Sequence, residues 1–549
     1  MEKKKSGIEM EVNKRLVAII MVVIIVGASV WAWYTYYYSV STLNVKELVF
    51  GMKVIPVGLE PVNSPGSPEI TINKHMYENL VTWTEVSASG PIIEPGLAES
   101  WEPYNATTFL FHLRKGVKFH CGAEFTAKDI VFSRERYDDP NITRLYTGGQ
   151  WYGLDNYQII DNYTILIGAD NILGAFFLYA AQHHCLIICS ECATKWGQDF
   201  GSHPCGTGPY KLEEFVLSER VIIERNENYW GQKPAIQRII WKPITDDLSR
   251  IASLQTGETD IIVDLPPSYV DLLNVSGYQI ITAPSVRTLN LHLNTRSPSP
   301  FSDVRVRQAA NYAVDIDTIV KEIYYGMATK ADDSVGPGVF GYHSHPIYSY
   351  NPEKAKSLLA EAGYTYPNGP TITIITPQGR YLMDRELAEA VAGYLRDVGF
   401  DVTIVVKEWG TYITEFITAA KACYANASYS PTGDIAVLGH APPTCDSDFS
   451  LGKWDGTAYA TNWGGFYNDS LTKLCWEAKS SLNQTLRLQL YDQCGQILVE
   501  NAMQIFTVVT PMILAAKPAG QPGAVSTGVL LLPTESYLFF MADMVPKSK

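Results

Sequence analysis

The sequence predicts a mixed α/β fold that follows one N-terminal transmembrane helix. Its clearest unit begins with a β-branched run from Pro370 to Thr376. Apolar residues at helical spacing follow from Met383 to Val398, where Gly399 ends the helix, and Asp401 to Val406 is a second β-rich run. Such a strand, helix and strand imply two parallel strands covered by a helix. The 549 residues leave room for two to four domains of about 100 to 200 residues each.

The N-terminal segment has the features of a membrane anchor. Leu16 to Trp33 is a run of eighteen residues without a charge, which is enough to cross a bilayer as a helix. Basic residues precede this run and Trp and Tyr residues follow it, so residues 1–41 form a cytoplasmic stub and anchor and the rest lies outside the cell. The alternative is a cleaved signal peptide, but Ala32 to Tyr38 is a poor cleavage site. We therefore expect a single-pass membrane protein.

Residues Leu97 to Arg136 carry the most specific pattern in the chain. Thr108 to Arg114 alternates like a half-buried strand, a tight connection follows, and Thr126 is a candidate N-cap for a helix. This order of elements is common. The particular residues are not, including Ala98-Glu-Ser-Trp101 and Arg114-Lys-Gly-Val117.

This window resembles the signature region of the family 5 extracellular solute-binding proteins, which deliver peptides, nickel or oligosaccharides to ABC importers. A lone Gly- and Pro-containing loop would be weak support. Further blocks extend the resemblance in the family's own order across most of the chain after residue 50. They are Gly206 to Tyr210, Glu224 to Gly231, Leu254 to Asp260, Pro300 to Arg307, Ala309 to Val314, Asn351 to Lys356 and Leu358 to Gly363.

The resemblance implies a three-lobed fold of the periplasmic-binding-protein type, with a ligand cleft between the lobes. Closure of the lobes around the ligand would exclude water. It further implies a monomeric receptor without a cofactor, which hands its solute to an ABC permease and performs no chemistry. The expected division is lobe I at residues 42–80, 205–285 and 512–549, lobe II at 81–204, and lobe III at 286–511.

Composition and motifs argue against other classes of function. A net charge of −14 without a basic stripe argues against nucleic acid as a partner. The chain has no GxSxG elbow or HExxH motif, so an extracellular hydrolase lacks an identifiable catalytic residue. A structural surface glycoprotein is the alternative of another class, although no internal repeat supports it.

Seven Asn-x-Ser/Thr sequons become meaningful if residues 42–549 lie outside the cell. Together with a protein anchor in place of a lipid, they favour a glycosylated archaeal cell-surface protein. The candidate asparagines are Asn105, Asn141, Asn162, Asn274, Asn426, Asn468 and Asn483.

Nine cysteines outside the cell point first to disulfides. Cys475 and Cys494 lie in two helical segments on either side of a turn at Asn483, so we expect them to face each other and form a bridge. A bridge between Cys423 and Cys445 resembles some relatives of the family.

The remaining cysteines permit two interpretations. His183, His184 and Cys185, followed by Cys189 and Cys192 and later by His203 and Cys205, offer imidazoles and thiolates for zinc. Their spacing matches no standard zinc pattern, and disulfides compete for the same sulfurs. We therefore predict no metal site, with Cys189 and Cys192 as disulfide candidates and Cys121 as the odd cysteine, while the pairing stays open.

The ligand class depends on a departure from the family pattern. Peptide-binding relatives place an acidic residue shortly after a Gly-Trp pair, where it holds the peptide's α-ammonium group. Here Gly439 is followed by His440 and then prolines, while Asp446 and Asp448 match later acidic residues of that loop. Loss of the first carboxylate removes a charge-assisted bond worth about 1.5 to 3 kcal/mol.

The composition, with 12 Trp, 33 Tyr and 18% charged residues, favours a neutral oligosaccharide, with a peptide as the alternative. Trp409 is the foremost predicted contact because it follows a strand and matches a cleft-lining family position. The other predicted contacts are His440, Tyr424, Tyr429, Trp454, Trp463 and Tyr467.

Overall fold

The computed structural model describes residues 47–518, apart from 57, 64–66, 88–89, 143–155, 169–173, 183–184, 235, 427, 443 and 455–461. The predicted anchor, Leu16 to Trp33, lies outside the described residues. Among those described, no helix has the length and apolar character needed to span a bilayer.

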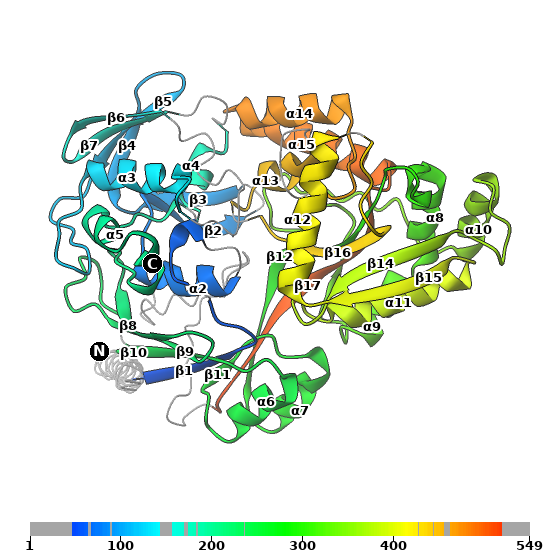
Figure 1. Cartoon of the computed structure of the whole chain (residues 1–549), viewed down its shortest axis with the longest axis horizontal. Coiled ribbons are helices and arrows are strands. Elements are labelled where there is room, and N and C mark those ends of the chain that lie inside the picture. Colours follow the sequence, from blue (N-terminus) through cyan, green and yellow to red (C-terminus); the bar gives the residue numbers. More distant parts are fainter. Residues whose placement is uncertain are drawn as a thin grey trace, which may run out of the picture.

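Two halves of the molecule are connected by two long strands, β12 (Gln279–Leu293) and β17 (Gln504–Ala516), which cross the centre of Figure 1. They belong to one eleven-stranded sheet with the order β15-β14-β16-β12-β17-β11-β1-β10-β9-β8, to which β13 adds by pairing with β17. The antiparallel register of β12 and β17 shifts between Pro284 and Thr288. The sheet therefore runs from one half of the molecule into the other through this central pair.

The strands on one side of the pair belong to the expected lobe I, and those on the other side to lobe III. The first set is β1 (Glu47–Met52), β8 (Tyr210–Val216), β9 (Arg220–Arg225), β10 (Arg238–Pro243) and β11 (Ile261–Ile262). The second set is β14 (Thr371–Pro377), β15 (Asp401–Lys407) and β16 (Ile435–His440), whereas β13 (Thr329–Lys330), also from the expected lobe III, pairs with the edge of β17 that faces away from β12. The predicted parallel pair is confirmed, because β14 runs parallel to both β15 and β16.

Residues of the expected lobe II form two smaller sheets. These are β2 (Val81–Ser87) with β3 (Gly90–Pro95), and β4 (Ala98–Pro103), β5 (Thr108–Leu113), β7 (Thr164–Gly168) and β6 (Asn156–Asp161) in that order. Helix α3 (Ala127–Asp138) begins as predicted at Thr126, whose backbone N–H donates to the Asp129 carboxylate at 3.0 Å in a capping box.

Helices cover the faces of the large sheet and lie against the smaller ones (Figure 1). Predicted helix Met383 to Val398 is confirmed as α11 (Asp384–Asp397), and Gly399 follows it with φ of 107°. The other α-helices are α2 (Ser67–Met76), α4 (Phe176–Ala180), α5 (Ser190–Trp196), α6 (Asp247–Gln255), α7 (Val270–Val275), α8 (Val304–Ala313), α9 (Ile316–Glu322), α10 (Pro352–Glu361), α12 (Trp409–Ala425), α13 (Ser447–Leu451), α14 (Asp469–Ser480) and α15 (Gln484–Glu500).

The hairpin of α14 and α15 confirms that Cys475 and Cys494 face each other. Asn483 accepts a hydrogen bond from the N–H of Leu486 and so caps α15. The two buried sulfurs lie 3.6 Å apart. Their bridge stays a prediction, as does one between Cys423, which donates to the Trp463 carbonyl, and Cys445, which packs in the core of lobes I and II.

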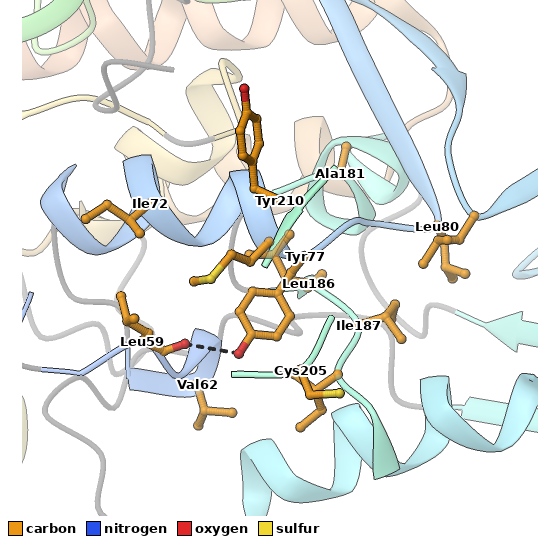
Figure 2. Close-up of a cluster of buried hydrophobic side chains, with 14 of the residues drawn as sticks. Leu59, Val62, Ile72, Tyr77, Leu80, Ala181, Leu186, Ile187, Cys205 and Tyr210 are labelled. Atoms are coloured by element: carbon orange, nitrogen blue, oxygen red, sulfur yellow. Dashed lines mark hydrogen bonds between the residues drawn. The ribbon is translucent and has the colours of Figure 1, made fainter. Parts of the chain in front are cut away.

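A continuous core joins lobes I and II around α2. The Tyr77 hydroxyl donates to the Leu59 carbonyl at 3.2 Å, and Leu186 and Ile187 pack around its ring (Figure 2). Gly206 lies so close to α2 that a Cβ there would come within 2.2 Å of the Met76 carbonyl oxygen. The first glycine of the Gly-Thr-Gly-Pro-Tyr segment, Gly206, therefore makes a close backbone contact with α2 that only glycine permits.

Candidate functional site

The carboxyl ends of three parallel strands meet at one edge of the sheet in lobe III. β14 ends at Pro377, which pairs in register with Lys407 at the end of β15, and β16 ends beside them at His440. In open α/β sheets, ligands bind in the crevice outside the carboxyl ends of the strands. We therefore take the loops that follow these strands as the candidate ligand site.

A cation lies over an aromatic platform at this edge. The Arg380 guanidinium lies 4.9 Å from the ring centroid of Trp409 and 5.0 Å from that of Tyr381. The two rings meet edge to face, with centroids 5.9 Å apart and an interplanar angle of 80°. Arg287 from β12 adds a second guanidinium 5.5 Å from the Tyr381 ring. Within the described part of the chain, no carboxylate pairs with the Arg380 guanidinium, so this arrangement suits an anionic group on a ligand.

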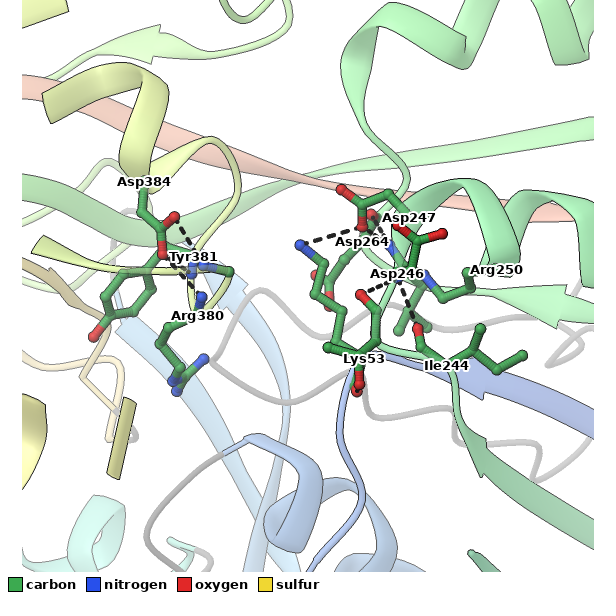
Figure 3. Close-up of polar contacts among 12 residues, drawn as sticks. Lys53, Ile244, Asp246, Asp247, Arg250, Asp264, Arg380, Tyr381 and Asp384 are labelled. Atoms are coloured by element: carbon green, nitrogen blue, oxygen red, sulfur yellow. Dashed lines mark hydrogen bonds and ion pairs between the residues drawn. The ribbon is translucent and has the colours of Figure 1, made fainter. Parts of the chain in front are cut away.

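The Arg380 loop is fixed by Asp384, the first residue of α11. Its buried carboxylate accepts hydrogen bonds from the backbone N–H groups of Gly379, Arg380 and Tyr381 at 3.1, 2.8 and 2.9 Å (Figure 3). Burial raises the pKa of Asp384, and these hydrogen bonds oppose that rise by stabilising the carboxylate. Leu382 of the same loop packs on the core around α6, α7 and β11. The loop therefore reaches from lobe III to lobe I.

A buried guanidinium makes the neighbouring part of lobe I rigid. Arg250 on α6 is fully buried and donates to the carbonyl oxygens of Ile244 and Val263, each at 3.0 Å. It also donates to the Asp247 carboxylate at 2.6 Å, and Lys53 approaches the same carboxylate at 3.4 Å (Figure 3). These bonds join the end of β10, the residues after β11 and the start of α6.

Two acidic residues in the loop after β16 are paired within the protein. Asp446 accepts hydrogen bonds from Arg487 to both carboxylate oxygens, at 2.9 and 2.8 Å, while both side chains are buried. Burial is the largest single influence and disfavours the Arg487 charge, but Asp446, Tyr491 and Asp448 together outweigh it and raise the Arg487 pKa. Asp448 accepts from the Tyr179 hydroxyl at 2.8 Å and pairs with Lys479 at 3.5 Å. Both carboxylates serve the fold, and the Tyr179 bond joins lobe II to lobe III.

Two of the predicted contact residues lie at the strand ends. Trp409 is partly buried and begins α12 directly after β15. His440 ends β16, where its ring stacks on Phe449 with a centroid distance of 5.9 Å. The preceding Gly439 packs so closely on Tyr381 that a Cβ would lie 2.6 Å from the ring. These residues and the Arg380 loop thus share one edge.

The other predicted contact residues have different surroundings. Trp454 is 1% exposed and stacks on His292 in the core under α14 and α15, and Trp463 is 3% exposed and stacks on Phe416. Tyr429 is partly buried against the lobe III core. Tyr424 and Tyr467 are 60% and 59% exposed on the surface. Trp454 and Trp463 are therefore packed inside the protein, and their contact with a ligand stays a prediction.

Sequence reasoning missed Arg380, Tyr381 and Arg287. The available signal was the Gln378-Gly-Arg380-Tyr381 phrase, which directly follows a predicted strand and precedes a predicted helix. A polar loop in that position is a typical binding loop of an α/β sheet.

Comparison with known proteins decides the family. The model of the bacterial extracellular solute-binding proteins, family 5 Middle, matches residues 93–462. The chain belongs to this family. It is therefore a substrate-binding receptor of an ABC importer that works outside the cytoplasm, in a family of binding proteins without enzymatic activity.

Relatives of this family-5 receptor differ in the ligand for which they are named. Heme-binding protein A of Haemophilus influenzae is 30% identical over 485 residues, 81% of this chain and 84% of the relative. The glutathione-binding protein GsiB of Salmonella choleraesuis is 26% identical over 505 residues, 91% of this chain and 95% of the relative. The solved structure of DppA from Helicobacter pylori with the peptide STSA has a TM-score of 0.76 and 25% identity, covering 90% of this chain and 97% of DppA.

Proposed function

We propose that this receptor captures a peptide-like ligand and that Arg380 binds its carboxylate. The Arg380 guanidinium, held over two rings at the strand ends, is the observation that carries the proposal. Heme, glutathione and a peptide, for which the three relatives are named, all carry carboxylates. The flat faces of Tyr381 and Trp409 would contact the apolar part of the ligand.

The acidic residues of the loop do not supply an ammonium site in this proposal. Asp446 is bonded to Arg487, and Asp448 to Tyr179 and Lys479, so both charges are already compensated. The receptor would select its ligand through the anionic end. The expected oligosaccharide has less support, because Trp454 and Trp463 lie in cores.

Titration calorimetry with matched ligands tests this function. We expect short peptides with a free C-terminal carboxylate to bind, the same peptides as C-terminal amides to bind about 10 to 100 times more weakly, and neutral oligosaccharides not to bind. Arg380→Gln should weaken the binding of the free-acid peptides and leave the binding of the amides unchanged. Arg385→Gln is the control, since Arg385 is exposed on α11 and paired with Glu389. Equal affinity for acids and amides, or binding of oligosaccharides alone, would refute the proposal.

We further infer that the receptor is held at the outer face of the membrane by Leu16 to Trp33 and that it is glycosylated. Six of the seven sequon asparagines are exposed, and the seventh, Asn468, is partly buried while its side chain caps α14. Intact mass would test the glycans, because a mass equal to that of the bare chain contradicts them.

A further inference from the structure

Four cysteines converge at the boundary of lobes I and II. The sulfur atoms of Cys121, Cys189, Cys192 and Cys205 all lie within 4.8 Å of one another. The Cys121 and Cys189 sulfurs are 3.6 Å apart, and those of Cys192 and Cys205 are 3.0 Å apart. Cys121, expected to be the odd cysteine, is thus part of the cluster, although 68 residues separate it from Cys189.

The backbone brings the four thiols together without any bond between sulfurs. The N–H of Cys189 donates to the Cys205 carbonyl at 3.1 Å, and the N–H of His120 donates to the Gly206 carbonyl at 2.9 Å. Cys189 and Cys192 lie at the cap and in the first turn of α5. Three separate segments are therefore held around one point. They are the turn after β5, the start of α5 and the loop before β8.

A tetrahedral ion explains this convergence better than two disulfides do. Zinc binds four thiolates at about 2.3 Å, which places the sulfurs roughly 3.8 Å from one another, within the observed range of 3.0 to 4.8 Å. Disulfides join sulfurs two at a time and do not require all four to meet. The nearby His203 is engaged elsewhere, since its ring stacks on Trp196 at 3.5 Å.

We propose that Cys121, Cys189, Cys192 and Cys205 bind one zinc ion in a structural tetrathiolate site. Each thiol gives its proton to solvent as its sulfur displaces a water from the ion. Four protein ligands leave no open position on the metal, so the site fixes structure and takes no part in ligand chemistry. It would fasten lobe II to the loop that leads through Gly206 back to lobe I. Cys205 lies beside the core around Tyr77 (Figure 2), so the clamp adjoins the join of the two lobes.

Metal analysis of the full chain tests the site. The protein is purified once with a thiol reductant and once without it, with no chelator, and zinc is measured by mass spectrometry. We expect one zinc per chain in the reduced protein. Cys121→Ser should reduce zinc at least tenfold while the protein keeps its circular dichroism, because Cys121 is exposed on a turn. The double variant Cys475→Ala with Cys494→Ala is the control and should retain full zinc.

Two further measurements separate zinc from disulfides. A chelator should lower the melting temperature of the wild type and leave that of Cys121→Ser unchanged, and cobalt added in place of zinc should give the visible bands of tetrahedral thiolate coordination. Less than a tenth of a zinc per chain after reduction and incubation with zinc would overturn the proposal. Retention of zinc by Cys121→Ser would also overturn it, as would peptide maps of the unreduced protein that show the four cysteines fully bridged.

Discussion

Arg487→Met should destabilise the protein strongly, because it leaves a buried carboxylate without its cation. Asp446 and Arg487 are 0% and 1% exposed, and the guanidinium also donates to the Ala478 carbonyl at 3.1 Å. After the substitution Asp446 keeps the Tyr491 hydroxyl at 3.2 Å as a donor, which does not compensate a full charge. Breaking a buried pair from one side costs about 3 to 5 kcal/mol.

Urea unfolding of the variant and of three companions, Arg385→Met, Asp446→Leu and the double variant, measures this cost. Arg385→Met removes an exposed helical pair with Glu389 and should change the free energy of unfolding by no more than ~0.5 kcal/mol. Asp446→Leu combined with Arg487→Met removes both charges and should recover at least ~2 kcal/mol relative to the sum of the single variants. A loss below ~1 kcal/mol for Arg487→Met, or full additivity in the double variant, would refute the view that this pair fixes the loop after β16.

Four further outcomes are expected. Trp409→Ala should weaken ligand binding by ~1 to 3 kcal/mol in calorimetry, whereas Trp409→Phe should keep most of the affinity. Unchanged affinity of Trp409→Ala together with a lower melting temperature would show that Trp409 is a core residue only. Burial lowers the pKa of Lys74 to about 8, below ~10.4 in the unfolded chain, so the unfolded state binds more protons between these two values. The free energy of unfolding should therefore rise with pH across that window by ~3 kcal/mol. Lys74→Met should remove the rise, and an unchanged slope contradicts it. Alkylation of the unreduced, denatured chain should leave Cys475 and Cys494 unlabelled if they are bridged, whereas labelling of both would show free thiols. The full chain should remain with membranes after a carbonate wash, and a soluble protein whose N-terminus lies after residue 33 would show cleavage instead.

Local features of the fold were predictable because their causes lie within a few residues. Thr126 and Asp129 form a capping box three positions apart, and Gly399 ends α11 with a positive φ. The hairpin around Asn483 follows from two helical segments and one cap. In each case the signal and its structural effect lie in the same stretch of chain.

Side-chain environments that depend on distant segments were harder to predict. Trp454 and Trp463 have the residue type of ligand contacts, yet His292 and Phe416 from elsewhere in the chain cover them. Cys121 joins a cluster whose other members come from the start of α5 and the loop after it. Sequence spacing does not show which side chain from another segment arrives beside a given position, and the role of the residue depends on that neighbour.

The contacts between lobes II and III bear on two separate properties of the receptor, the approach of its lobes and its selection of ligands. Pro284 and Pro511 pair at the centre of the two connecting strands, next to the shift in register. Because proline has no N–H to donate, the hydrogen bonding between β12 and β17 is weakest there. Asp448 accepts from the Tyr179 hydroxyl across these lobes, and a hydrogen bond to a charged group contributes about 1.5 to 3 kcal/mol. This bond involves no ligand group, so it favours contact between the lobes equally for every ligand. In the proposed function, discrimination between ligands therefore falls to groups that the ligand itself must satisfy, foremost the Arg380 guanidinium over Trp409.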